Sequence, residues 1–211
     1  TGGGKQMMFF RYILLTLFHP TQAYYKIQKQ APRWFAFVLI PFACIMPVLS
    51  IYMTHYPLQS ADVRDKNVVV ELLTALVLIV TWIVANYAVS TINDGEAQFR
   101  SVMVGTAFSL LPYIIFTVPL ALASNLMCAE ELGLYRFLKA VIYIWVGILL
   151  FIQVATTNNY TLGQTLFNII VTLVCMIMVW AAISIIFLQV SDWYHFIKDV
   201  LYELKIMALN G

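Results

Sequence analysis

Hydrophobic residues in this chain gather into long runs from which charged side chains are missing. Four stretches contain no Asp, Glu, Lys or Arg, namely residues 34–61, 72–93, 101–129 and 140–191. A helix needs about 20 apolar residues to cross the hydrocarbon core, and a charge at its centre costs roughly 2.5–3.5 kcal/mol. The pattern therefore predicts a membrane protein.

The lengths of the apolar runs predict five membrane-spanning helices. These cover residues 34–53, 68–90, 102–123, 137–154 and 167–190. The runs are apolar on every side, whereas barrel strands alternate apolar and polar residues, and short polar connections leave no room for another domain. We therefore expect an all-α fold, a polytopic bundle of five transmembrane helices, with residues 34–190 as its membrane domain.

The N-terminal segment, residues 1–33, predicts two short helices lying in the membrane interface. Residues 7–18 are apolar but too few to span, and Pro20 ends the run because proline disfavours helix at the residue before it. Residues 21–30 form the second expected helix. We expect its Tyr24 and Ile27 to face lipid, and Lys26 and Lys29 to meet anionic headgroups.

The C-terminal segment, residues 191–211, predicts an amphipathic helix. Ser191 has the chemistry of a helix cap, and apolar residues recur after it at helical spacing while charged residues occupy the other side. We expect this helix to lie along the membrane surface; the alternative is a docking helix for a partner protein.

Composition narrows the class of protein. The 211 residues are 62% hydrophobic and 10% charged, against about 25% charged in soluble domains, and the net charge of +2 is too small for nucleic-acid binding. Positive charge before the first span predicts a cytoplasmic N-terminus. The residues concerned are Lys5, Arg11, Lys26, Lys29 and Arg33. With this orientation six Lys and Arg residues lie on each side of the membrane, so the predicted orientation depends on the charges of that first segment.

Catalytic motifs are absent from the sequence. There is no His-Glu-x-x-His zinc motif, no Gly-x-Ser-x-Gly elbow and no metal-ligand spacing among the three cysteines. Glu130-Glu131 with Arg136 resembles an intramembrane protease signature, but the arginine comes one residue late and the spans contain no histidine. The sequence therefore predicts a protein that is not an enzyme.

Prolines interrupt two of the predicted spans. Each removes a backbone hydrogen bond that lipid cannot replace, so neighbouring helices must cover the gap. Packing is the simpler interpretation; the functional one is that the broken third span lines a polar cavity. The candidate residues for this cavity are Asn86, Ser109, Pro112 and Tyr113.

The turn after the second span, Asp94-Gly95-Glu96, is the best candidate for a functional site. Carboxylate oxygens are ligands of Mg²⁺ and Ca²⁺, and a glycine between two acids would let both reach one ion. Alternatively, Gly95 supplies a positive φ at the helix exit while Glu96 pairs with Arg100. The sequence thus predicts no cofactor other than a possible divalent cation at Asp94 and Glu96.

This region resembles bacterial members of the Yip1 family. The resemblance rests on three segments in register: a W-x-x-x-N-(x)3-S-T segment from Trp82 to Thr91, the D-G-E turn, and S-L-L-P-Y from Ser109 to Tyr113. The Phe18-His19-Pro20 start fits as well, whereas Ala97 stands where many relatives carry a second glycine. Eukaryotic members of the family reside in Golgi and endoplasmic reticulum membranes and associate with Rab GTPases. Bacteria lack that machinery, so the resemblance implies the fold but not that role.

Two functions follow from these observations. The first is a non-catalytic protein of the bacterial cytoplasmic membrane, a membrane scaffold that associates with lipids and with other integral membrane proteins. The alternative is a transport component, either a small carrier or an accessory subunit of a membrane transporter, because polar residues flank a proline-broken helix.

Overall fold

The computed structural model describes residues 3–30, 32–55 and 67–210, and in these ranges the chain is helical with no strand. The helices follow one another in chain order as α1 (Gly3–Phe18), α2 (Pro20–Gln30), α3 (Trp34–Met53), α4 (Val68–Ile92), α5 (Phe99–Ser109), α6 (Leu111–Ala123), α7 (Leu132–Asn158) and α8 (Leu162–Asn210). Two 3-10 turns, Ser124–Leu126 and Ala129–Glu131, connect α6 to α7.

Five of the helical segments are long and apolar enough to cross a membrane, which confirms the predicted fold class. They are Trp34–Met53, Val68–Ile92, Phe99–Leu126, Leu132–Asn158 and Leu162–Val190. Four of the five extend beyond the apolar runs read from the sequence. The reason is that the helix continues past the apolar run. Polar residues at its end, such as Thr91 before Ile92, still form the backbone hydrogen bonds of a helix.

The third span is two helices rather than one. α5 ends at Ser109 and α6 begins at Leu111, with Pro112 in the first turn of α6. Proline has no N–H to donate to the preceding turn, so the ladder is interrupted at this point. The expected break in this span is confirmed, whereas α3 continues as a helix through Pro41 and Pro47.

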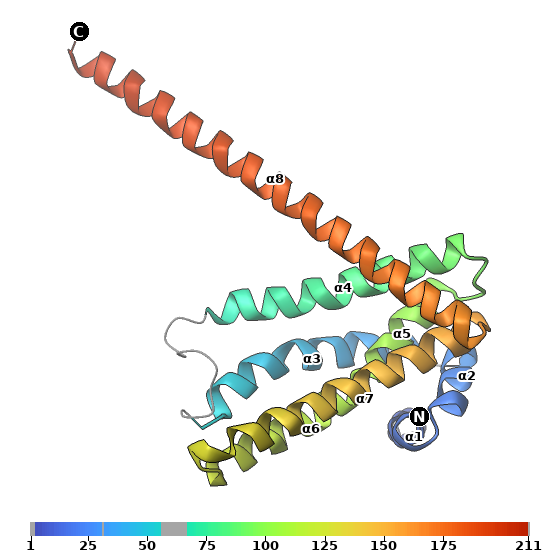
Figure 1. The fold of residues 1–211 in the computed structure, drawn as a ribbon. Coiled ribbons are helices and arrows are strands. Elements are labelled where there is room, and N and C mark those ends of the chain that lie inside the picture. The colour runs from blue at the N-terminus through green and yellow to red at the C-terminus, as the bar shows by residue number, and fades with distance from the viewer. Residues whose placement is uncertain (1–2, 31, 56–66, 211) are drawn as a thin grey trace. The chain divides into compact units, whose positions relative to one another are not determined.

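The chain divides into two compact units, one ending at Thr172 and one beginning at Leu173. In the first unit α3 packs against α4 and α6, and α7 packs against α5 and α6 (Figure 1). The short helix α2 lies against α5 and α7, and α1 lies against α2. Gln28 of α2 donates to the Thr157 carbonyl, so α2 lies near the C-terminal end of α7.

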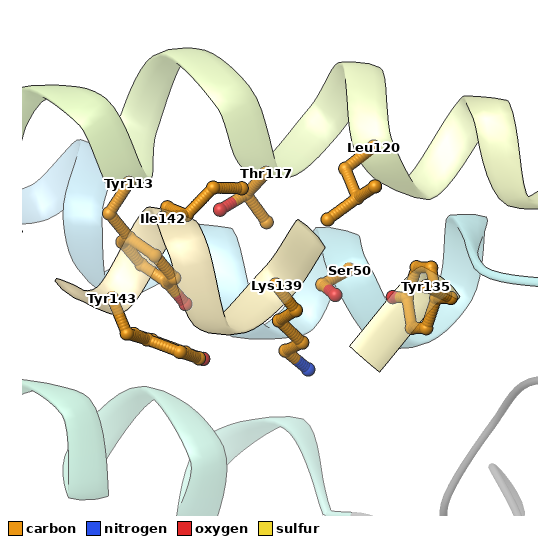
Figure 2. A pocket seen from close by; sticks show the side chains of 8 residues that line it. All are labelled: Ser50, Tyr113, Thr117, Leu120, Tyr135, Lys139, Ile142 and Tyr143. Carbon is orange, nitrogen blue, oxygen red and sulfur yellow. The ribbon is translucent and has the colours of Figure 1, made fainter. Parts of the chain in front are cut away.

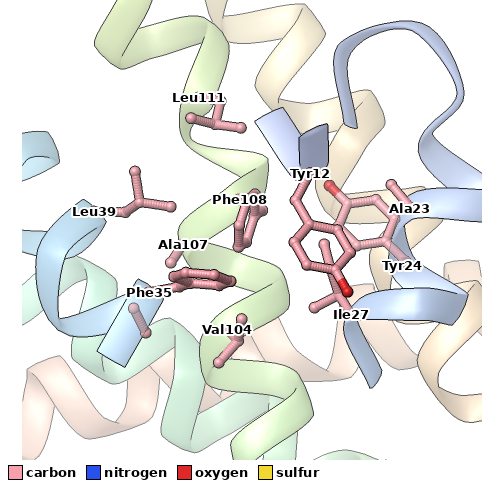
Figure 3. Packing of buried hydrophobic residues seen from close by; sticks show 11 residues of the cluster. Tyr12, Ala23, Tyr24, Ile27, Phe35, Leu39, Val104, Ala107, Phe108 and Leu111 are labelled. Carbon is pink, nitrogen blue, oxygen red and sulfur yellow. The ribbon is translucent and has the colours of Figure 1, made fainter. Parts of the chain in front are cut away.

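The N-terminal helices bury their apolar faces in protein. Tyr24 and Ile27 of α2 are 0% and 1% exposed, and Tyr12 of α1 packs edge to face on Phe35 and Phe108 at 6.0 and 6.2 Å (Figure 3). The expectation that Tyr24 and Ile27 face lipid is therefore wrong. An amphipathic pattern indicates that a helix packs on an apolar surface, but it does not say which surface. Here that surface includes α5.

The last helix, α8, runs without interruption from Leu162 to Asn210. The separate helix expected to begin at Ser191 is therefore wrong, because the residues around 191 contain no proline or glycine to end the span. The surface position of residues 191–211 stays a prediction.

Candidate functional site

The Asp94-Gly95-Glu96 turn closes the C-terminal end of α4. The backbone N–H of Asn93 donates to the Val89 carbonyl at 3.0 Å, and the N–H of Gly95 donates to the Ser90 carbonyl at 2.8 Å. Asp94 stands between them with a φ of +54°. This is the geometry of a Schellman motif, in which one left-handed residue lets the chain fold back on the last helical carbonyls.

The left-handed residue of this turn is Asp94, and no glycine among the described residues has a positive φ. The expectation that Gly95 supplies the positive φ is therefore wrong. Asp tolerates the left-handed region because its short side chain can satisfy the local backbone. Gly95 must therefore be explained by something other than its own torsion angle.

Gly95 lies where a second turn approaches the first. A Cβ at this position would overlap the side-chain oxygen of Asn158 and would stand 2.6 Å from the Tyr160 hydroxyl and 2.8 Å from the Ser90 carbonyl oxygen. Ordinary contact distances begin at 3.4 Å. The glycine is required because the α7–α8 turn occupies the space that a side chain would fill.

The α7–α8 turn repeats the same local geometry. Asn159 has a φ of +55°, and the N–H of Tyr160 donates to the Ala155 carbonyl at 3.0 Å. Asn tolerates the left-handed region for the same reason as Asp. Two helices in the first unit, α4 and α7, therefore end in equivalent motifs that meet each other.

Side chains of the α7–α8 turn satisfy the exposed backbone of the α4 end. The Tyr160 hydroxyl lies within hydrogen-bonding distance of the Ser90 carbonyl (3.2 Å) and the Asn93 carbonyl (3.0 Å), and the Ala97 N–H donates to the Asn158 side chain at 3.3 Å. The last carbonyls of a helix lack intrahelical partners. Tyr160 supplies those partners from a segment more than sixty residues away, while Asn158 accepts the Ala97 N–H that follows the turn.

The two carboxylates of the turn point outward from this junction. Asp94 and Glu96 are both exposed, and Glu96 accepts a hydrogen bond from the Asn159 side chain. The expected pairing of Glu96 with Arg100 is not among the contacts of the described residues. No group of three His, Cys, Asp or Glu side chains able to hold a metal occurs there either. The divalent-ion hypothesis for Asp94 and Glu96 stays a prediction.

The surroundings of Tyr160 change the acidity of its hydroxyl. Desolvation raises the pKa of this group above the ordinary tyrosine value, the negative charge of Asp94 adds to the rise, and hydrogen bonds to Asn168 and Ser90 oppose it. The hydroxyl therefore stays protonated through the physiological range and remains a donor to the α4 carbonyls.

The four residues predicted to line a polar cavity lie in different environments. Ser109 is fully buried, lies 2.7 Å from the Tyr24 hydroxyl, and donates to the Gly105 carbonyl at 2.9 Å. Burial raises the pKa of Tyr24 well above its usual range. Pro112 is buried at the break between α5 and α6. Ser109 and Pro112 thus serve the packing of the third span.

Asn86 lies in α4 with 0% exposure, and among the described residues neither its Nδ2 nor its Oδ1 has a hydrogen-bond partner. One turn later Ser90 lies 3.4 Å from the Asn168 Nδ2. The Oδ1 atom of Asn168 is buried and unpartnered as well. Buried amides normally find partners in protein or ordered water. Asn86 therefore marks a polar interior whose bonds the protein alone does not complete.

Two further polar residues of this interior were not singled out from the sequence. Gln153 of α7 is fully buried and lies against Gly105, where a Cβ would come within 2.7 Å of its Cγ atom. Gln28 of α2 donates to the Thr157 carbonyl at 3.1 Å. For Gln153 the available signal was a polar side chain inside an apolar run, because such residues are expensive in lipid and face the bundle interior; Gln28 lies in a polar segment, where this signal is absent.

Tyr113, the fourth cavity candidate, lines a pocket between α3, α6 and α7 (Figure 2). Its volume is about 10 Å³, room for about one water molecule, and it is partly open to the outside. Tyr113 stacks on Tyr143 with ring centroids 5.8 Å apart, and the Tyr135 hydroxyl lies 3.1 Å from the Thr54 hydroxyl. The complete lining is Ser50, Tyr113, Thr117, Leu120, Tyr135, Lys139, Ile142 and Tyr143.

Glu130 and Glu131 have a structural role at the start of α7. They form a 3-10 turn before α7, and Glu131 accepts a hydrogen bond from the Cys128 N–H at 3.0 Å. The carboxylate therefore closes a local turn ahead of the helix.

Comparison with known proteins agrees with this architecture. No curated protein and no solved structure matches the chain. The family model described as the Yip1 domain matches residues 14–183, which include α2 to α7 and all but the end of the fifth span. The match covers most of the chain and includes both turns of the candidate site. The chain therefore belongs to the Yip1 family of membrane proteins.

Proposed function

We propose that this chain is a non-catalytic integral membrane protein that acts by association with other membrane proteins or with lipids. The proposal places it in a bacterial cytoplasmic membrane with its N-terminus in the cytoplasm, because five positive charges and no acidic residue precede the first span.

One observation carries this proposal: in the first unit, polar side chains bond inward between helices. Tyr24 reaches Ser109, Gln28 reaches Thr157, and Tyr160 reaches the end of α4. Every buried polar residue that the structure describes is an uncharged Ser, Thr, Asn or Gln. No Asp, Glu, Lys, Arg or His side chain is buried among the described residues, and the ionisable groups of this interior are tyrosines and Cys44.

The outward surface of the same helices is apolar. Large exposed side chains of the first unit include Phe42, Leu73, Phe116, Phe137, Ile144 and Ile148. In a membrane such side chains contact lipid or another helix, and helix association depends on packing and polar contacts rather than on hydrophobic burial. Lateral contact is thus the chemistry that this surface offers.

The test is to extract the full chain from its native host with the surrounding lipid, at its natural expression level. A protein partner near one copy per chain, or one lipid class enriched over the bulk membrane, is expected. A second five-span protein from the same membrane serves as the control for non-selective recovery. Recovery of the chain with bulk lipid alone would overturn the proposal.

Asn86 favours a second candidate, a transport component. Its fully buried amide has two unpartnered atoms inside a predicted span, and an intramembrane polar group of this kind commonly lines a solute or water path. The unpartnered oxygen of Asn168 adds a second polar group from α8.

Replacement of Asn86 distinguishes a path from a packing defect. If the amide only packs, Asn86→Leu should raise the thermal stability of the detergent-solubilised protein, since it removes about 1–3 kcal/mol of unmet desolvation cost. If the amide lines a path, the same variant should lower ion or solute flux in proteoliposomes. Flux that is absent from wild-type vesicles would rule out the carrier form of this alternative.

A further inference from the structure

The pocket between α3, α6 and α7 contains a cation that has no partner in the described part of the chain. Lys139 lines it half-buried, and its amine forms no ion pair or hydrogen bond with any residue in the described ranges. A lysine amine has three hydrogen-bond donors and no acceptor. The pocket thus offers a positive charge with unused donors.

Hydroxyl groups line the same pocket as this amine. Figure 2 shows the hydroxyls of Tyr113 and Tyr143 on one side of Lys139 and that of Tyr135 on the other. Ser50 and Thr117 add two further hydroxyls to the lining. A cation and hydroxyl donors in one pocket match an oxyanion, because charge-assisted hydrogen bonds are the strong ones.

The position of Lys139 along the axis of α7 indicates which oxyanion can reach its amine. Lys139 is seven residues after Leu132, the first residue of α7, so its Cα lies about 10 Å along the helix axis. A helix of 27 residues is roughly 40 Å long and exceeds the hydrocarbon core by about 5 Å at each end. Helical side chains point toward the N-terminus, which brings the amine close to the level of lipid phosphates.

We propose that the open side of this pocket binds the phosphate group of an anionic phospholipid, with Lys139 as its cation and the hydroxyl of Tyr143, one turn further along α7, as a hydrogen-bond donor. The inference rests on the proposed function, of which it names one lipid ligand. The apolar walls formed by Leu120 and Ile142 would contact the beginning of the acyl chains.

Glu71 is the acidic residue that bears on this site. It lies in the first turn of α4, within electrostatic range of Tyr113. A carboxylate so placed repels a phosphate and attracts Lys139. The proposal therefore requires that neutralising Glu71 strengthens phospholipid binding or leaves it unchanged.

Lipid binding to the purified full chain tests the pocket, by native mass spectrometry with phosphatidylglycerol against phosphatidylcholine. The wild type is expected to prefer phosphatidylglycerol, and Lys139→Gln to weaken that binding about tenfold, since one charge-assisted hydrogen bond is lost. Arg136→Gln is the matched control, because Arg136 is exposed one turn earlier on α7 and does not line the pocket. It should change the affinity less than about twofold. Lys139→Arg should retain most of the binding.

Competition on the unmodified protein separates the two sources of phosphate. Inorganic phosphate at the concentration of the lipid should leave phosphatidylglycerol bound; equal displacement would overturn the lipid assignment. Equal losses in the Lys139→Gln and Arg136→Gln variants would reduce the effect to surface charge and overturn the pocket. Weaker binding in Glu71→Gln would overturn it as well. These failures leave the proposed function intact, because its own test is recovery of a partner or lipid from the native membrane.

Discussion

Replacing Gly95 with alanine should destabilise the junction of the two turns. The new methyl group would meet the Tyr160 hydroxyl at 2.6 Å and the Ser90 carbonyl oxygen at 2.8 Å, and would overlap the Asn158 side chain. The Ser90 carbonyl belongs to the α4 backbone and cannot rotate away. Withdrawal of the α7–α8 turn would relieve the contacts with Asn158 and Tyr160, whereas the contact with Ser90 requires the end of α4 itself to shift.

The size of the effect follows from the contacts that such a withdrawal breaks. Overpacking by one methyl group costs about 1–3 kcal/mol, and each lost hydrogen bond of Tyr160 or Asn158 costs about 1 kcal/mol. Alanine returns about 0.4–1 kcal/mol by restricting the unfolded chain. We expect a net loss of about 2–4 kcal/mol in the free energy of unfolding.

Equilibrium unfolding in detergent micelles, followed by helical circular dichroism, measures this loss. Gly147→Ala is the matched control, because Gly147 lies inside α7 and a methyl group added there would meet nothing within 4 Å. It should be neutral or stabilising by up to about 1 kcal/mol. A Gly95→Ala variant within about 0.5 kcal/mol of wild type, the usual range for independent surface changes, would refute the close-approach reasoning.

The double variant Gly95→Ala with Tyr160→Phe locates the clash. Phenylalanine lacks the hydroxyl oxygen that the new methyl would meet at 2.6 Å. The two changes should therefore couple, with the pair costing less than the sum of the single variants by more than about 0.5 kcal/mol. Strict additivity would show that the methyl group is accommodated elsewhere.

Three other predictions concern charge and topology. Burial raises the pKa of Tyr24, so the unfolded chain loses its proton first and stability should fall as pH rises above about 10; this fall should be smaller in Tyr24→Phe, measured by thermal unfolding across pH. If Asp94 and Glu96 hold a divalent ion, Mg²⁺ or Ca²⁺ should raise the melting temperature of the wild type but not of Asp94→Asn with Glu96→Gln, and equal melting curves with and without the ions would remove the metal hypothesis. Cysteines placed at Gln98 and Leu126, at opposite ends of the third span, should react from opposite faces of the membrane, with position 98 on the cytoplasmic face; labelling of both from one face would contradict the five-span count.

The spans of this protein are determined by its sequence because hydropathy is a local quantity. A bilayer requires about 20 apolar residues in a row whatever lies beside them, so the run that begins at Trp34 could be placed from the sequence alone. The breaks at Pro20 and Pro112 are local for the same reason, since a proline lacks its N–H in any environment. The sequence also predicts the turn at Asp94. It assigns the positive φ to the neighbouring Gly95, whereas in the structure Asp94 has it.

Only the tertiary structure decided which surfaces meet. In lipid every apolar face is equally satisfied by acyl chains, so hydropathy does not say that Tyr24 packs on α5 instead of lying in the interface. The same limit hid the role of Gly95, whose missing side chain matters only because Asn158 and Tyr160 arrive from another turn. In the sequence Lys139 is one of twelve basic residues. Only the packing of α3, α6 and α7 places it in a pocket with hydroxyl side chains. Contacts between helices depend on shape and on a few polar atoms, and the hydrophobic periodicity of one segment predicts neither of them.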